Sequence, residues 1–188
     1  DIQEIAQALA VLRGNKLKPH NITILQCTSQ YPAKIDDINL RVMQSLRDQF
    51  KLQVGYSDHT LGLEAPIAAA ALGASIIEKH ITLDVTMPGP DHKASMEPEN
   101  FLAMVSAIRK IEQSLGNGIK TPTKDELEMR TVARKSLVAK TNINEGDLLT
   151  LDNLAIKRPG NGISPMDIDS VIGKQAPCSF KINDLIKI

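Results

Sequence analysis

Apolar residues recur at helical spacing in four stretches of the first part of the chain, and three short apolar runs lie between them. The stretches with helical spacing are residues 1–14, 35–50, 63–72 and 98–115. The apolar runs begin the segments ITILQCTSQYP, LQVGYSDH and ASIIEKHIT. Apolar runs that end in polar residues are typical of strands buried on both faces. This order predicts an α/β fold with parallel strands joined by right-handed βα crossovers.

The ends of two of these helices carry recognisable signals. Asp1 and Glu4 have the spacing of a capping box, and Pro98 suits the first turn of the last helix. Three strands cannot close a barrel, because an eight-stranded barrel takes about 250 residues. The pattern therefore leaves two alternatives, an open sheet or part of a larger fold.

The pattern changes after residue 115. Residues 116–131 are polar and interrupted by glycine and proline, which predicts an interdomain linker. Beyond them, five short apolar runs (SLVAK, DLLT, LAIKR, SVIGK and DLIKI) alternate with turn signals such as Pro159-Gly160 and Asn161-Gly162. Residues 132–188 are therefore predicted to form a compact, strand-rich domain.

Composition and charge narrow the range of partners. Hydrophobic residues make up 42% and charged residues 23%, as in soluble globular proteins, and basic and acidic residues are equal at 22 each. Such a chain has no overall field for nucleic acid or for an anionic membrane. The longest apolar stretch, residues 65–77, is shorter than the roughly 20 residues of a membrane helix. Cys27 and Cys178 are expected to be reduced core thiols of a cytoplasmic protein, and no secretion signal is present in this portion.

Polar residues that end consecutive predicted strands are the main candidates for chemistry, because loops at the carboxyl edge of a parallel sheet form its ligand face. His59 and His80 occupy matched positions there. Two imidazoles from neighbouring strands can share a divalent cation such as Mn²⁺ or Zn²⁺. The alternative is that each histidine simply caps a strand, and His20 is interpreted as a surface residue.

Two loops carry further candidates. The segment MPGPDHKAS contains Asp91 and His92 and could orient a hydroxyl-bearing substrate, although a turn capped by Asp91 is an equal alternative. The segment KRPGNGIS contains Lys157 and Arg158 and suits either a surface hairpin or the binding of a sugar or carboxylate.

The motifs CTSQYP, GYSDHT, EKHITLD, PGPDHKAS, ARKSLVAK and KRPGNGISP occur in an order that resembles the sialic acid synthase family. The bacterial N-acetylneuraminate synthases look most similar, followed by legionaminate and pseudaminate synthases. The resemblance implies the C-terminal part of a (β/α)₈ TIM barrel at residues 1–115, a linker at 116–131, and a small β-rich antifreeze-like (SAF, β-clip) domain at 132–188.

The resemblance also implies roles for individual residues. It makes His59 and His80 the ligands of a metal, usually Mn²⁺, with Mg²⁺ and Co²⁺ as alternatives. It places Ser57 and Ser29 against phosphoenolpyruvate, although some family members have asparagine at the position of Ser29. The residues implied to position the amino sugar are Tyr31, Glu78 and Asp91. Arg158 would enter the barrel of a partner subunit, which implies a domain-swapped homodimer.

The activity implied by the resemblance is a transferase reaction that joins phosphoenolpyruvate to an N-acylated hexosamine, such as N-acetylmannosamine, and releases phosphate. The family's donor-binding lysines lie on barrel strands that this chain lacks, so we expect these 188 residues alone to be inactive. The alternatives are a metal-dependent hydrolase and a non-catalytic carbohydrate-binding module.

Overall fold

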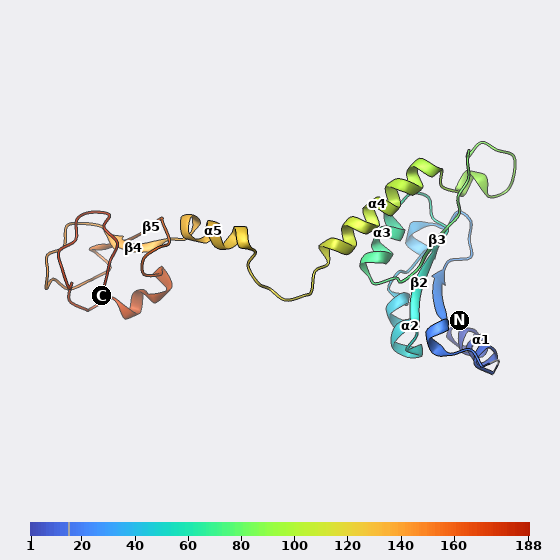
Figure 1. The fold of residues 1–188 in the computed structure, drawn as a ribbon, viewed down its shortest axis with the longest axis horizontal. Helices are drawn as coiled ribbons and strands as arrows, with labels where there is room; N and C mark the ends of the chain where they lie inside the picture. Colours follow the sequence, from blue (N-terminus) through green and yellow to red (C-terminus); the bar gives the residue numbers. More distant parts are fainter. Residues whose placement is uncertain (15) are drawn as a thin grey trace. The chain divides into compact units, whose positions relative to one another are not determined.

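The computed structural model describes residues 1–14 and 16–188, which form two compact units (Figure 1). The first unit is Asp1–Gly118 and the second is Ile119–Ile188. Asn15, in the predicted turn after the first helix, lies outside the described residues. Each unit has a core of its own and is described by itself.

The first unit alternates helices and strands in the predicted order. Its helices and strands are α1 (Ile2–Gly14), β1 (Thr23–Cys27), α2 (Val42–Phe50), β2 (Gln53–Asp58), α3 (Glu64–Ala71), β3 (Ile77–Lys79) and α4 (Pro98–Ser114). Three 3₁₀ turns, η1 (Pro19–Asn21), η2 (Ile35–Asp37) and η3 (His92–Ala94), lie in the connections. The strands are parallel in the order β1-β2-β3. In Figure 1, α3 and α4 run beside each other. The predicted α/β class is confirmed.

The sheet register assigns each strand residue to one of two faces. Ser57 lies opposite Cys27 on β1 and Glu78 on β3, and Asp58 lies opposite Lys79. Because side chains alternate along a strand, Ser57 and Asp58 point to opposite faces. Tyr56, on the same face as Asp58, packs in a core with residues of α2 and α3. We call this side the helix face, and the side of Ser57 the site face.

The helix predicted at residues 35–50 is divided. Residues Ile35–Asp37 form the 3₁₀ turn η2, and α2 begins only at Val42. Between them Asn39 has a φ of 43°, which is left-handed backbone and interrupts helical hydrogen bonding. The apolar spacing continued across this break because Ile38 and Leu46 still enter the same core.

The second unit has less regular structure than predicted. It contains α5 (Lys124–Ala133), the antiparallel strands β4 (Ser136–Ala139) and β5 (Leu154–Lys157), and the 3₁₀ helix η4 (Pro165–Ser170). The other predicted strands form only isolated bridges in the described residues, such as Ile143 with Phe180 and Leu148 with Gln175. The paired strands are thus short, and irregular segments supply much of this core.

Most of helix α5 lies in the segment predicted as a linker, and its last turn extends to Ala133. Thr123 accepts a hydrogen bond from the backbone N–H of Glu126, and the Glu126 carboxylate accepts one from the N–H of Thr123. This reciprocal capping box satisfies two N–H groups that a helix start leaves open. The spacing of threonine and glutamate was the signal in the sequence that could have identified this helix.

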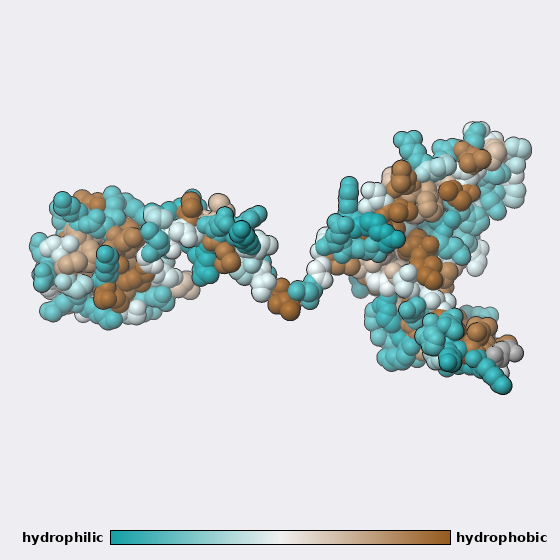
Figure 2. All heavy atoms as spheres, viewed as in Figure 1, coloured by the Kyte–Doolittle hydropathy of each residue, from teal (hydrophilic) through white to brown (hydrophobic). Residues whose placement is uncertain are grey.

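The prediction of buried core positions for the cysteines is wrong, because Cys27 and Cys178 are both exposed free thiols. Cys27 ends β1, which pairs with β2 on one side and with no strand of the described residues on the other. Apolar side chains also reach the surface of both units (Figure 2), including Leu83 and Met166. Within the described residues, no helix has both the length and the apolar character needed to cross a membrane.

Candidate functional site

The two predicted metal ligands come together at the carboxyl ends of β2 and β3. The ring centroids of His59 and His80 are 5.4 Å apart, and the rings are nearly perpendicular, at 85°. One residue beyond the paired strands, the register still brings the two histidines opposite each other on the site face. Backbone bonds hold both positions, from Ala33 N–H to the His59 carbonyl (2.8 Å) and from Met96 N–H to the His80 carbonyl (2.9 Å).

Tyr31 packs against both imidazoles. Its ring centroid lies 4.9 Å from that of His59 and 4.4 Å from that of His80. The Tyr31 hydroxyl is buried and has no hydrogen-bond partner among the described residues. Burial raises the pKa of this hydroxyl above its usual value. The side chain of Ser95 lowers the pKa in part, and the negative charge of Asp91 raises it further. Tyr31 therefore stays a neutral hydroxyl beside the histidine pair.

The histidine pair fits a divalent cation with open coordination positions. The Nδ1–H of His59 donates to the carbonyl oxygen of Thr28 (3.0 Å), which leaves Nε2 as the lone-pair nitrogen. Metal-binding histidines are commonly oriented by such a bond from the other ring nitrogen. No three His, Cys, Asp or Glu side chains form a metal-binding group in the described part of the chain. At this position the described residues thus offer two imidazoles, and any further ligands would be water, substrate oxygens or other groups.

Ser57 and Glu78 form a hydrogen-bonded pair next to the histidines. The Ser57 hydroxyl donates to the Glu78 carboxylate at 2.6 Å, in keeping with their paired positions on β2 and β3. Ser57 is buried and Glu78 is exposed. A carboxylate at this edge can accept hydrogen bonds from ligand hydroxyls while Ser57 keeps its orientation fixed.

The loop after β3 carries Asp91, which is exposed. Its backbone carbonyl accepts bonds from the Ser95 hydroxyl (2.7 Å) and from Ala94 N–H (3.1 Å), so the residue sits in an ordered turn. His92 is anchored beside it, because its Nδ1 lies 2.7 Å from the Thr82 hydroxyl. The Asp91 side chain makes no hydrogen bond to the histidine pair in the described structure, although its charge acts on Tyr31.

Ser29 and His20 both lie on the surface of the first unit. Ser29 is exposed, and none of the described contacts joins it to the histidine pair. His20 is exposed in the turn before β1, as predicted for a surface residue.

Arg158 belongs to the second unit, where the end of α5 orients its loop. The Nε–H of Arg158 donates to the carbonyl of Ala133 (3.0 Å), and Gly160 N–H donates to the carbonyl of Thr131 (2.7 Å). A Cβ at Gly160 would lie 2.5 Å from the Cβ of Arg134, so only glycine allows this close approach. The Arg158 side chain is exposed and keeps further N–H donors for a ligand.

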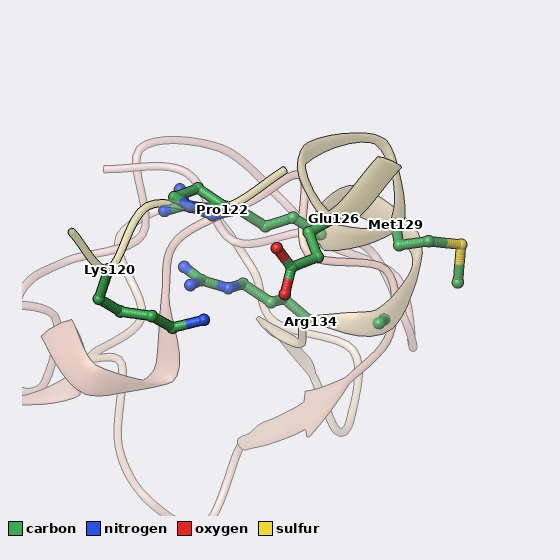
Figure 3. A pocket seen from close by; sticks show the side chains of 7 residues that line it. Lys120, Pro122, Glu126, Met129 and Arg134 are labelled. Atoms are coloured by element: carbon green, nitrogen blue, oxygen red, sulfur yellow. The ribbon is translucent and has the colours of Figure 1, made fainter. Parts of the chain in front are cut away.

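A basic pocket in the second unit was missed by sequence reasoning (Figure 3). Its volume is about 520 Å³, and its charged lining residues are Lys120, Glu126, Arg130 and Arg134. Figure 3 shows Lys120 and Arg134 directed towards the space beside the Glu126 carboxylate. The polar segment had been interpreted as a linker, so its cations were not expected to share one pocket.

Comparison with known proteins gives matches across both units. Residues 1–120 match the NeuB family, and residues 134–188 match the SAF domain. The chain is 49% identical over 187 residues to the N,N'-diacetyllegionaminic acid synthase of Campylobacter jejuni, a match that covers 100% of this chain and 56% of that protein. It is 40% identical over 168 residues to the human N-acetylneuraminate-9-phosphate synthase, covering 88% and 47%.

A solved structure resembles about two thirds of the chain. The N-acetylneuraminic acid (sialic acid) synthetase from Leptospira borgpetersenii, in complex with citrate, matches with a TM-score of 0.61 and 37% identity, over 68% of this chain and 44% of that one. The chain spans about half the length of the curated relatives that it matches. The predicted fold, the C-terminal part of a (β/α)₈ barrel followed by a SAF domain, is confirmed. The chain belongs to the NeuB family.

Proposed function

We propose that the full-length protein condenses phosphoenolpyruvate with an N-acylated hexosamine to give a nonulosonic acid and phosphate. Relatives in this family are named as synthases of legionaminic, pseudaminic and N-acetylneuraminic-type acids. The observation that carries the proposal is the pair of imidazoles, His59 and His80, held together beside Tyr31 on the site face. This arrangement suits activation of a carbonyl oxygen next to a polyhydroxylated ligand.

In the proposed reaction, C3 of phosphoenolpyruvate attacks the aldehyde carbon of the open-chain sugar. Water then adds at C2, and phosphate leaves with cleavage of the C–O bond, so the product is a 2-keto acid extended by three carbons. A bound divalent cation, Mn²⁺ by family resemblance with Mg²⁺ and Co²⁺ as alternatives, would withdraw electrons from the aldehyde oxygen. His59 and His80 would hold this cation through neutral ring nitrogens.

Other residues near the histidine pair would position the two substrates. Glu78 and Asp91 would accept hydrogen bonds from sugar hydroxyls. The buried hydroxyl of Tyr31, on which the charge of Asp91 acts, would bind the same ligand. Ser57, which Glu78 already orients, would contact phosphoenolpyruvate together with Ser29. Holding both reactants in one geometry lowers the entropic part of the barrier.

A second copy of the protein is proposed to complete the active site. Arg158, exposed and anchored at the end of α5, would contact the N-acyl group of the sugar bound in the partner subunit. Such a domain-swapped homodimer makes each site depend on both chains. We also expect that the 188-residue chain alone has no condensing activity, because by family resemblance the lysines that hold phosphoenolpyruvate lie on barrel strands outside these residues.

The acceptor sugar is proposed to be N-acetylmannosamine or a 6-deoxy diamino relative. The 49% identity to a legionaminic acid synthase, against 40% to the human N-acetylneuraminate-9-phosphate synthase, favours the diamino sugar. The test is an assay of the full-length protein with phosphoenolpyruvate, Mn²⁺ and a panel of amino sugars, measuring phosphate release. Phosphate release that needs one of these sugars would support the proposal. No release with any sugar, together with sugar binding by residues 131–188 alone, would instead indicate a binding module.

A further inference from the structure

A buried ion pair lies directly behind the histidine pair. The Lys79 ammonium is 2.6 Å from the Asp58 carboxylate, and the two side chains are 2% and 0% exposed. Asp58 immediately precedes His59, and Lys79 immediately precedes His80. The register pairs Asp58 with Lys79, so the ion pair joins β2 to β3 on the helix face, one residue before the imidazoles on the site face.

Further hydrogen bonds make this ion pair rigid. One carboxylate oxygen of Asp58 accepts bonds from the Tyr56 hydroxyl (3.0 Å), from the Thr60 N–H (3.0 Å) and from the Thr60 hydroxyl (2.9 Å). The other oxygen accepts from Lys79, which also donates to the Thr60 carbonyl. Lys79 therefore contacts the residues on both sides of His59, while its own backbone leads directly into His80.

Stability alone does not account for this network. Burying two charges costs desolvation, and well-packed apolar replacements of such pairs are often equally stable. The pair Arg109–Glu112 on α4, whose side chains are 67% and 47% exposed, avoids this cost. A buried, fully bonded pair does fix one relative position of two chain segments, which an apolar contact does not.

We propose that the Asp58–Lys79 ion pair is a positioning clamp that sets the separation and orientation of the His59 and His80 imidazoles for a divalent cation. The inference rests on the proposed function, since it concerns the cation that the two histidines would hold. Both nitrogens must come within about 2.0–2.2 Å of one ion, so small shifts between β2 and β3 change its affinity. Neither clamp residue touches the cation, and both act through the backbone of the histidines.

The test compares Mn²⁺ binding by variants of the full-length protein. Asp58→Asn combined with Lys79→Met removes both charges, while the amide oxygen of the introduced asparagine can still accept from Tyr56 and Thr60. Titration calorimetry should show the dissociation constant for Mn²⁺ raised about 10- to 100-fold, as for other groups that orient metal ligands. The visible absorption spectrum of bound Co²⁺ should also change, because it reports the ligand geometry. Circular dichroism should show an unchanged fold.

The matched control is Arg109→Met combined with Glu112→Gln, which removes an exposed ion pair and should leave the dissociation constant within about twofold. A milder variant, Thr60→Val, removes one bond to Asp58 and should raise the dissociation constant by a smaller factor, about threefold. It decides the question if the double variant does not fold. Unchanged Mn²⁺ affinity and Co²⁺ spectrum in the folded double variant, or in Thr60→Val where only that variant folds, would overturn the clamp.

Mn²⁺ binding by histidine variants distinguishes a wrong cation site from a wrong clamp. If Mn²⁺ still binds as tightly after His59→Ala or His80→Ala as it does to the unaltered protein, the cation site itself is wrong, and the clamp is refuted with it. If those histidine variants lose binding but the clamp variants do not, the proposed cation site stands and only the clamp is refuted.

Discussion

The two units of the chain bury different kinds of side chain. The first unit buries polar residues where its strands end, namely Ser57, Asp58, Thr60 and Thr82, whereas Ser136 is the one buried polar residue of the second unit among those described. Buried polar groups need hydrogen-bond partners and cost free energy without them. Their concentration at the ends of β2 and β3 indicates that hydrogen bonds hold the side chains of this region in fixed positions. The core of the second unit consists mainly of packed apolar side chains.

Ser136 extends this comparison to the second unit. Its hydroxyl donates to the Pro159 carbonyl (2.7 Å) and accepts from Gly162 N–H (2.8 Å). These bonds hold the loop that follows Arg158. Among the described residues, the one buried polar residue of the second unit thus bonds to the loop that follows Arg158, the residue that we propose to be functional.

The largest expected effect is on the polar region of the first unit. His59→Ala or His80→Ala in the full-length protein should lower the rate of condensation roughly a thousandfold, since a cation contributes several kcal/mol to such a step. Steady-state assays at several Mn²⁺ concentrations would measure this. The control is His20→Ala, which changes an exposed histidine. A normal rate with a normal Mn²⁺ requirement in either test variant would contradict the assignment.

A core substitution in the second unit should act on stability instead. Leu137 is 0% exposed, and Leu137→Ala should lower the free energy of unfolding of this unit by about 2–5 kcal/mol. Calorimetry would record the shift in the unfolding transition. Leu151→Ala, at a side chain that is 69% exposed, should change the free energy by less than about 0.5 kcal/mol. Equal effects of the two variants would mean that this core is not the source of stability.

Arg158 should combine a functional effect with normal stability. Loss of a charged hydrogen bond is expected to cost about 1.5–3 kcal/mol, so Arg158→Ala should raise the KM for the amino sugar about 10- to 100-fold. The KM for phosphoenolpyruvate and the melting temperature should stay near their original values. Lys174→Ala, another exposed cation of this unit, is the control. An unchanged KM for the sugar would exclude the proposed contact.

The smallest effect concerns the capping box of α5. Hydrogen bonds from Thr123 and the charge of Lys120 lower the pKa of Glu126 below its usual 4.5 in the folded protein. The ionised group therefore stabilises α5 above the pKa of the unfolded chain, and this contribution is lost as the pH falls through the lowered folded value. NMR chemical shifts of α5 should report less helix at low pH. Glu126→Gln should flatten this pH dependence, whereas Glu128→Gln should retain it.

The sequence was sufficient where the apolar spacing followed regular structure. It predicted the strands of the first unit and α4, because apolar side chains of each pack in or against a core. It failed where local backbone geometry decides the outcome, as at Asn39, which divides the predicted helix before α2. In the second unit, runs such as DLLT and SVIGK are apolar because they line a core, although their backbone does not form strands.

The candidate site was predictable to a similar extent. Matched positions at strand ends suggested that His59 and His80 would meet, and their rings do lie together. The pairing of Asp58 with Lys79 was not predicted, because it depends on the register between β2 and β3 and on which face each residue occupies. Periodicity alone did not assign a role to charged residues inside strands.

Side chains alternate between the two faces along β2 and β3, and this limits the insertions and deletions that these strands can accept. Deleting Glu78 from β3 would turn His80 to the helix face and bring Lys79 to the site face. Changes in the length of the connecting segments, by contrast, leave the pairing intact. We expect insertions and deletions among natural variants to be confined to those connections, even where individual residues differ freely.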